Sequence, residues 1–375
     1  MRALPGCWLR RLSHLALGAL AVAANFSLAQ DPASPTLDES ADRSARLVAN
    51  ARREGSLSLY ASMAEKDLIR LVSEFERRYG IKVNVWRSGK NNVLRRAVTE
   101  ARAGRFEVDV VHNPAPEMEL LHRERLLQEV RSPYQRELIP EAVAPHREWA
   151  GPRVYVFVQA YNTSRVKSGE LPKTFGDLLD PRWKGRIAVE AKEQEWFFTL
   201  VREMGEENGL KFFRELVAKN GLTVRNGNAL LNNLVVAGEI PLALTLYSYL
   251  PEQSKRSGAP IDWFALQPTV AYTDGIGVMK RAPHPHAAVL FYDFVLSDGQ
   301  ALLAELNHVI SHRRNERNLR KFDLKFIELD AVLAEYDRWT RIFEDTIYGR
   351  GTGVPAPTAS HSVRSCPSRI ARRCG

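Results

Sequence analysis

The stretch Leu171–Trp196, LPKTFGDLLDPRWKGRIAVEAKEQEW, contains a helix, a turn, a strand and a polar loop before a second helix. Thr174 is a suitable N-cap for a short helix that ends at Pro181. The apolar run 187–189 predicts a buried strand, and the polar segment 190–195 follows it. Open α/β sheets bind ligands where strand ends meet helix N-termini, so this stretch predicts a ligand-facing edge.

The same stretch resembles the second-lobe motif of type 2 periplasmic solute-binding proteins, nearest to the iron(III), thiamine and aminoalkylphosphonate binders of bacterial ABC importers. Other matching segments keep the family's order across about residues 49–312: Leu57–Ser62, Phe75–Val85, Ala103–Val111, Ala160–Thr163, Ala237–Glu239 and Phe294–Ser297. The resemblance implies an α/β, two-lobed type 2 periplasmic binding protein fold. Each lobe is expected to be a mostly parallel sheet flanked by helices, with two crossover strands, 154–162 and 270–279, forming a hinge.

We expect the chain to be organised around this fold in five parts. Residues 1–29 have three arginines before the apolar run 12–28, which is typical of a cleavable signal peptide and predicts a periplasmic protein. The other expected parts are a flexible leader at 30–43, lobe 1 at 44–155 and 271–312, lobe 2 at 156–270 and 313–349, and a disordered basic tail at 350–375. Residues 316–347 are expected to be helical and to brace lobe 2.

Charge and cysteine content exclude several classes of function. The net charge is +9, but three positive charges lie in 1–29 and five in 350–375, so residues 30–349 carry only +1 and a nucleic-acid interface is not expected. Cys7 lies in the signal segment and Cys366 and Cys374 lie in the tail, so the core is free of cysteine. No catalytic motif is present, and we expect a monomeric binding protein that is not an enzyme.

Candidate ligand-binding residues follow strand ends or lie on the crossover strands. The polar turn at Ser88-Gly89 suits an anion but also an ordinary helix cap, and Lys90 beside it favours the anion slightly. Glu190 and Glu195 could hold an amine under the indole of Trp196, or be solvated acids. The full predicted set is Tyr60, Ser62, Ser88, Gly89, Asn113, Glu190, Trp196, Asn226, Tyr247, Tyr249 and Asp274.

The segment Tyr247-Ser248-Tyr249 bears most on the ligand. In the ferric-binding branch, adjacent tyrosines at this place supply phenolate oxygens to iron; here Tyr249 occupies one of those positions and Ser248 the other. That branch also carries a histidine after the first strand, where this chain has Ser62–Glu65. His284 and His286 have metal-like spacing, but Pro285 at a helix start explains the segment better.

The resemblance therefore implies the substrate-binding component of an ABC importer, which closes around a small solute and docks on an inner-membrane permease. A small organic or organophosphorus solute is the preferred ligand. The alternative is ferric iron or an iron chelate, with Tyr247 and Tyr249 as metal ligands and iron as transported ligand, not resident cofactor. A second alternative is a periplasmic sensor subunit for a membrane receptor.

Overall fold

The computed structural model describes residues 34–349. The predicted signal peptide, the tail and all three cysteines lie outside these residues. The described part of the predicted leader, from Ser34, is folded in turns against lobe 1, because the Thr36 side chain is buried and its carbonyl accepts the Arg131 amide. A first helix then begins at Arg43.

Lobe 1 is built on three parallel strands in the order β2-β1-β3, which are β2 (Lys82–Arg87), β1 (Ser56–Ala61) and β3 (Val110–Pro114). Its helices are α1 (Arg43–Glu54), α2 (Glu65–Tyr79), α3 (Lys90–Arg102), α4 (Ala115–Arg123), α9 (Pro285–Leu296) and α10 (Asp298–Glu305). Helices α1 and α2 end at Gly55 and Gly80, whose φ angles of 73° and 71° are left-handed, a conformation that glycine adopts without strain at helix ends.

Lobe 2 is built on β6, β5 and β7, which are parallel, and β8 pairs antiparallel with the crossover strand β4. These strands are β5 (Ile187–Glu190), β6 (Thr223–Arg225), β7 (Leu242–Tyr247) and β8 (Ile261–Phe264). The helices are α5 (Gln194–Glu203), α6 (Glu206–Asn220), α7 (Asn228–Val236), α8 (Tyr249–Arg256), α12 (Leu329–Ala334) and α13 (Tyr336–Ile347). The helix expected after Thr174 is a 3-10 turn at Gly176–Leu179, and a second 3-10 turn at Pro181–Trp183 separates it from the strand β5 that the sequence predicts.

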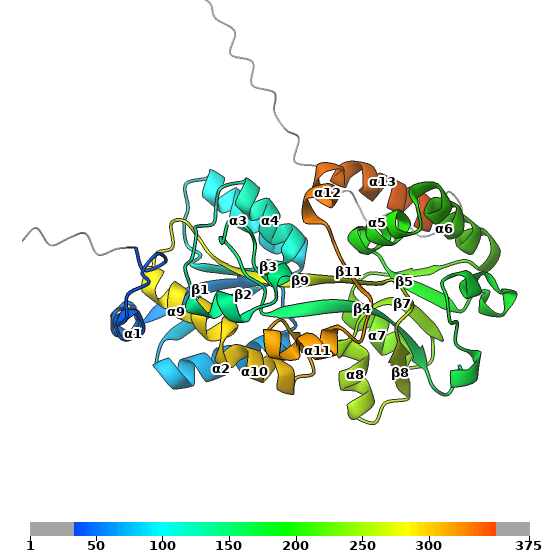
Figure 1. Cartoon of the computed structure of the whole chain (residues 1–375), viewed down its shortest axis with the longest axis horizontal. Helices are drawn as coiled ribbons and strands as arrows, with labels where there is room; N and C mark the ends of the chain where they lie inside the picture. Colours follow the sequence, from blue (N-terminus) through cyan, green and yellow to red (C-terminus); the bar gives the residue numbers. More distant parts are fainter. Residues whose placement is uncertain (1–33, 350–375) are drawn as a thin grey trace, which may run out of the picture. The chain divides into compact units, whose positions relative to one another are not determined.

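Two long strands connect the lobes. β4 (Arg153–Asn162) and β9 (Thr269–Val278) pair antiparallel with each other; β9 also pairs with β3 of lobe 1, and β4 with β7 of lobe 2. Figure 1 shows both strands running between the two sets of strands. All residues of both strands are buried, as expected for hinge strands covered on both faces.

The end of the chain differs from the predicted helical segment 316–347. α11 (Glu316–Leu319) stops early, and β11 (Leu324–Phe326) then pairs parallel with β9 before α12 begins. A further short strand, β10 (Val309–Ile310), pairs with β4. The apolar spacing of residues 324–326 is compatible with a helix or a strand. These residues form a strand because they pair with the open edge of β9.

Each lobe has its own hydrophobic core. The lobe 1 core includes Phe75, Phe291 and Phe294, and the lobe 2 core includes Trp196, Phe213 and Trp339. Among the described residues, no single helix is long and apolar enough to cross a membrane. The bent pair α9 and α10 passes by length and composition, but α9 is a buried helix of lobe 1. The two-lobed α/β fold is confirmed, and the predicted lobe boundaries stay a prediction.

Candidate functional site

Buried charged side chains gather where helices of the two lobes meet. Lys90 is the first residue of α3, and Glu117 and Glu195 lie in the first turns of α4 and α5. The Lys90 ammonium lies 3.5 Å from Glu117 Oε1 and 3.4 Å from Glu195 Oε1. Since α3 and α4 belong to lobe 1 and α5 to lobe 2, this ammonium joins the lobes. We call Lys90, Glu117, Glu193, Glu195, Tyr247 and Tyr272 the interlobe cluster.

The strand order of lobe 1 positions its share of the cluster. Parallel strands β1 and β3 end at the same edge, and α4 follows β3 without a loop, which brings Glu117 to that edge. Gly89 precedes α3 in extended conformation. The Asn113 side-chain amide, at the end of β3, donates a 3.0 Å hydrogen bond to the Lys90 carbonyl and so fixes the start of α3.

Lobe 2 contributes a connected set of oxygen atoms. Glu193, directly before α5, accepts hydrogen bonds at Oε1 from Tyr247 Oη at 2.7 Å and from Asn228 Nδ2 at 2.8 Å. Tyr247 Oη lies 2.7 Å from Tyr272 Oη on β9. The buried carboxyl group of Glu193, the buried phenol of Tyr272 and the half-buried phenol of Tyr247 therefore lie next to one another beside the crossover strands.

Burial dominates the electrostatics of this cluster. Burial raises the pKa of Glu117 to about 7, although Lys90 opposes the shift and the charge of Glu195 adds to it. Burial also raises the pKa of Glu193 to about 8, again with Lys90 opposing. The pKa of Lys90 is well above its usual value, because the carboxylates of Glu117 and Glu195 outweigh the effect of burial. Three carboxyl groups thus share one cation.

The carboxyl groups are incompletely satisfied. Glu117 Oε2, Glu193 Oε2 and Glu195 Oε2 are buried and have no hydrogen-bond partner among residues 34–349. Leaving a buried carboxylate oxygen unpaired is costly, so native structures pair such atoms or neutralise them. The arrangement is chemically suited to a cation that prefers oxygen donors.

A second buried network lies next to the cluster on the crossover strands. Arg153 donates to Asp274 at 2.6 Å and contacts His308 at 3.1 Å, and His308 Nε2 lies 2.8 Å from Asp67 Oδ2. The ring of Tyr249 packs on His308 with centroids 4.1 Å apart. Burial lowers the pKa of His308 to about 4, helped by the charge of Arg153.

Several predicted site residues come together in or beside the interlobe cluster. Tyr247 belongs to it, Asn113 supports it, and the ring of Tyr249 is nearly parallel to that of Tyr247 at 6.4 Å. Glu190 lies near enough to Glu193 for its charge to act on that residue. Its own carboxylate accepts hydrogen bonds from the backbone amides of Lys192 and Gly227, at 2.5 and 2.8 Å. Glu190 therefore holds two loops together.

Other predicted site residues lie elsewhere. Trp196 packs in the core of lobe 2 against Phe157 and Phe213. Asp274 is buried between Arg153 and His112, as an ion pair of the hinge.

The Tyr60 hydroxyl donates a 2.8 Å hydrogen bond to the Glu100 carboxylate within lobe 1. The Ser88 hydroxyl accepts a hydrogen bond from the side-chain amide of Asn92, one helical turn further along the chain. Gly89 and Asn226 are exposed and Ser62 is half-buried. These residues lie outside the interlobe cluster.

Sequence reasoning missed Glu117, Glu193 and Asn228. Acids in the first turn of a helix, such as Glu117, are usually solvated residues that interact with the helix dipole, so their type and position gave no signal. Asn228 is two residues beyond the predicted Asn226. Only the sheet topology, which sets all these chain segments at one edge, could have identified them.

Comparison with known proteins gives a consistent family. Residues 117–320 match the family model described as "Bacterial extracellular solute-binding protein". The chain is 27% identical over 269 residues to Iron uptake protein A1 of Synechocystis sp., covering 67% of this chain and 74% of that protein. It is 24% identical over 269 residues to the Fe(3+)-binding periplasmic protein of Serratia marcescens, covering 68% and 78%.

The fold is also that of a solved periplasmic binding protein. AfuA from Actinobacillus pleuropneumoniae, with exogenous fructose-6-phosphate bound, aligns with a TM-score of 0.69 at 21% identity, covering 79% of this chain and 99% of that one. At this identity the likeness shows the fold, a two-lobed type 2 periplasmic binding protein.

Proposed function

Because this chain belongs to the bacterial extracellular solute-binding proteins and is the periplasmic binding component of an ABC importer, we propose that its solute is ferric iron. The observation that carries this proposal is the interlobe cluster, in which Glu117 and Glu195 contact one ammonium, Glu193 is bonded to Tyr247, and each of these three carboxyl groups keeps an unpartnered oxygen. Fe³⁺ is a hard cation, and carboxylates and phenolates are the hard oxygen donors that bind it.

The charge of the site favours iron over the organophosphorus solute that the sequence first suggests. A phosphate placed among Glu117, Glu193 and Glu195 would meet carboxylate oxygens on every side, with Lys90 as the one cation of the cluster. The phosphate would be repelled by whichever of these carboxyl groups is ionised and attracted by Lys90 alone. Two relatives whose names refer to iron support the same choice.

The mechanism follows from the position of Lys90. In the structure its ammonium lies between Glu117 of lobe 1 and Glu195 of lobe 2, where it supplies positive charge between the lobes. An incoming Fe³⁺ displaces this ammonium from the carboxylates and takes Glu193 and Tyr247 as ligands, and the protons of the Glu193 carboxyl and the Tyr247 phenol are released to solvent. Tyr249, parallel to Tyr247, is the next phenol available. Closure of the lobes then presents the closed form to the permease.

The proposal is tested by titrating the purified, iron-free protein with ferric citrate and recording visible absorption. Phenolate ligands give a tyrosinate-to-iron charge-transfer band. Tyr247→Phe should abolish or shift the band and weaken binding at least tenfold, and Tyr249→Phe should weaken binding less. Tyr161→Phe, on β4 within lobe 2, is the matched control and should bind iron as the wild type does.

A parallel thermal-shift measurement uses fructose-6-phosphate and thiamine as competing candidates. Stabilisation by the sugar phosphate, with no effect of iron and no visible band, would overturn the iron proposal in favour of an organophosphorus solute.

A further inference from the structure

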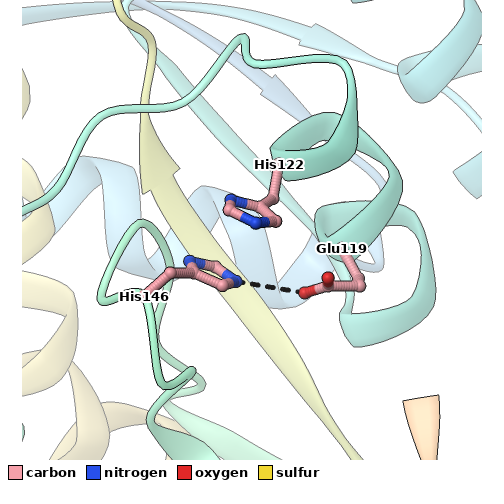
Figure 2. Close-up of side chains that lie close together, drawn as sticks. All are labelled: Glu119, His122 and His146. Carbon is pink, nitrogen blue, oxygen red and sulfur yellow. Dashed lines mark hydrogen bonds and ion pairs between the residues drawn. The ribbon is translucent and has the colours of Figure 1, made fainter. Parts of the chain in front are cut away.

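A second group of metal-binding side chains lies on lobe 1, outside the interlobe cluster. Glu119 and His122 come from α4, and His146 comes from the turn between Val143 and Ala150 (Figure 2). One donor atom from each of the three lies within 4.8 Å of the others, and no other set of three His, Cys, Asp or Glu side chains in residues 34–349 does so.

The helix places this group away from the iron site. Glu119 and His122 are three residues apart and share one face of α4, which is the Glu-x-x-His spacing used by helical metal sites. Glu117 precedes Glu119 by two residues, or about 200° of helical rotation, so it faces the opposite side. The two groups are therefore separate sites on one helix.

His122 is arranged as a metal ligand. Its Nδ1 lies 2.8 Å from Glu148 Oε2, so the carboxylate holds the ring proton on Nδ1. Nε2 then keeps its lone pair, and it has no hydrogen-bond partner among the described residues. A carboxylate that fixes the tautomer of a ligating histidine is the usual outer support of metal sites.

His146 and Glu119 supply the other two donors. His146 Nε2 lies 3.1 Å from Glu119 Oε2, and the ring is parallel to that of His122 at 3.6 Å. The Glu148 amide donates to His146 Nδ1 at 3.1 Å, so in the empty site the ring proton is on Nε2 and points to Glu119. When a metal ion binds His146 Nε2, the ring proton moves from Nε2 to Nδ1. Nδ1 then no longer accepts the hydrogen bond from the Glu148 backbone amide.

His312 lies in a turn like that of His146 and serves as a comparison for the group Glu119, His122 and His146. Its Nδ1 accepts the Arg314 amide at 3.1 Å and its Nε2 lies 2.9 Å from Glu137 Oε2, the same two contacts that His146 makes. His312 has no second imidazole within metal-sharing distance. His122, with a free Nε2 and its own carboxylate, is therefore the feature that makes a site. Because imidazole lone pairs lie in the ring planes, one of the two stacked rings turns when both bind the same ion.

We propose that Glu119, His122 and His146 bind one divalent late transition-metal ion, for which Zn²⁺ is the probe. Two imidazoles and one carboxylate suit Zn²⁺, Cu²⁺ and Ni²⁺. Three protein ligands leave a position for water or an external ligand. The side chains are 12% to 30% exposed, so the ion reaches them from solvent without opening of the lobes.

The test is calorimetric titration of the purified, chelator-treated protein with zinc chloride. His122→Ala and His146→Ala should each lower zinc affinity at least tenfold, and Glu148→Gln should lower it by about tenfold to a hundredfold through loss of the supporting contact. His312→Ala should leave zinc affinity unchanged. Equal zinc affinity in wild type and both His122→Ala and His146→Ala would overturn the proposal.

Two further measurements separate this site from the iron site and from a folding defect. Zinc anomalous scattering from wild-type crystals should give a peak bonded to all three side chains, and a peak only elsewhere would overturn the proposal. His122→Ala should keep the ferric charge-transfer band, and Tyr247→Phe should keep the zinc titration. The two proposals can therefore fail independently.

Discussion

Glu193 is the residue whose environment is most unusual for its type. It is a buried carboxyl group beside Tyr247 and Asn228, near two other acids and one lysine. Its pKa of about 8, and that of about 7 for Glu117, mean that the folded, iron-free protein holds protons that the unfolded chain has released near pH 4.5.

This difference predicts how stability depends on pH. Between about pH 5 and pH 8 the folded state binds more protons than the unfolded state, so the free energy of unfolding should fall as pH rises. Urea unfolding of the iron-free protein from pH 5 to pH 9 measures the fall. Glu193→Gln cannot ionise, so its curve should be flatter than that of wild type. Parallel curves would contradict the assigned pKa shift.

The residue scale is also where the sequence predicts least. Tyr247 and Asn113 could be placed at strand ends, because strand and turn patterns are local. Trp196 could not be assigned to the core, since an indole after a polar loop fits a ligand site equally well. Glu117 and Glu193 become unusual only when residues far apart in sequence bury them, and burial by distant segments leaves no local pattern.

At the scale of elements, the entrance to β4 is tightly packed. A Cβ added to Gly151 would lie 2.4 Å from the Asp274 carbonyl oxygen and 2.7 Å from Thr273 Cβ on β9. Gly151→Ala should therefore lower the free energy of unfolding by about 1–3 kcal/mol, because backbone must shift. Gly169→Ala is the control, with no atom within 4 Å of the added Cβ. Equal midpoints of urea unfolding for both variants would refute this account.

Helix α9 depends on a cap from another helix. Its own N-cap residue, His284, makes no capping bond, while Glu54 at the end of α1 accepts the amides of His286 and Ala287. Glu54→Ala should lower the free energy of unfolding by about 0.5–2 kcal/mol. Glu141→Ala, an exposed acid, should change it little. The measurement is chemical denaturation, and no loss in Glu54→Ala would show that the amides find other acceptors.

Helices and strands could be predicted where local sequence patterns define them, but not where a strand forms only by pairing with a distant segment. The glycine stops of α1 and α2 and the apolar strands β4 and β7 can be read from periodicity and turn residues. β11 could not, because three residues around Lys325 become a strand only by pairing with β9.

At the scale of the whole molecule, Lys90 holds the lobes together without iron. It is the cation between acids of both lobes, so Lys90→Met removes the charge pairs that link Glu117 of lobe 1 to Glu195 of lobe 2. We expect the iron-free variant to have a larger radius of gyration in small-angle scattering than wild type, and ferric iron to reverse the change. Lys66→Met, on the exposed surface of α2, should scatter as wild type. An unchanged radius in Lys90→Met would rule out this role.

Lobe 1 is formed by two stretches of the chain that lie before and after most of lobe 2, and this arrangement sets the order in which the lobes can fold. The lobe 1 core needs Phe291 and Phe294 of α9, and β9 gains its parallel neighbour only when β11 follows. The first lobe therefore cannot finish folding until nearly all of the second has been synthesised. A nascent chain that has not yet reached α9 therefore lacks part of the lobe 1 core, and compaction of that lobe waits for residues that come after most of lobe 2.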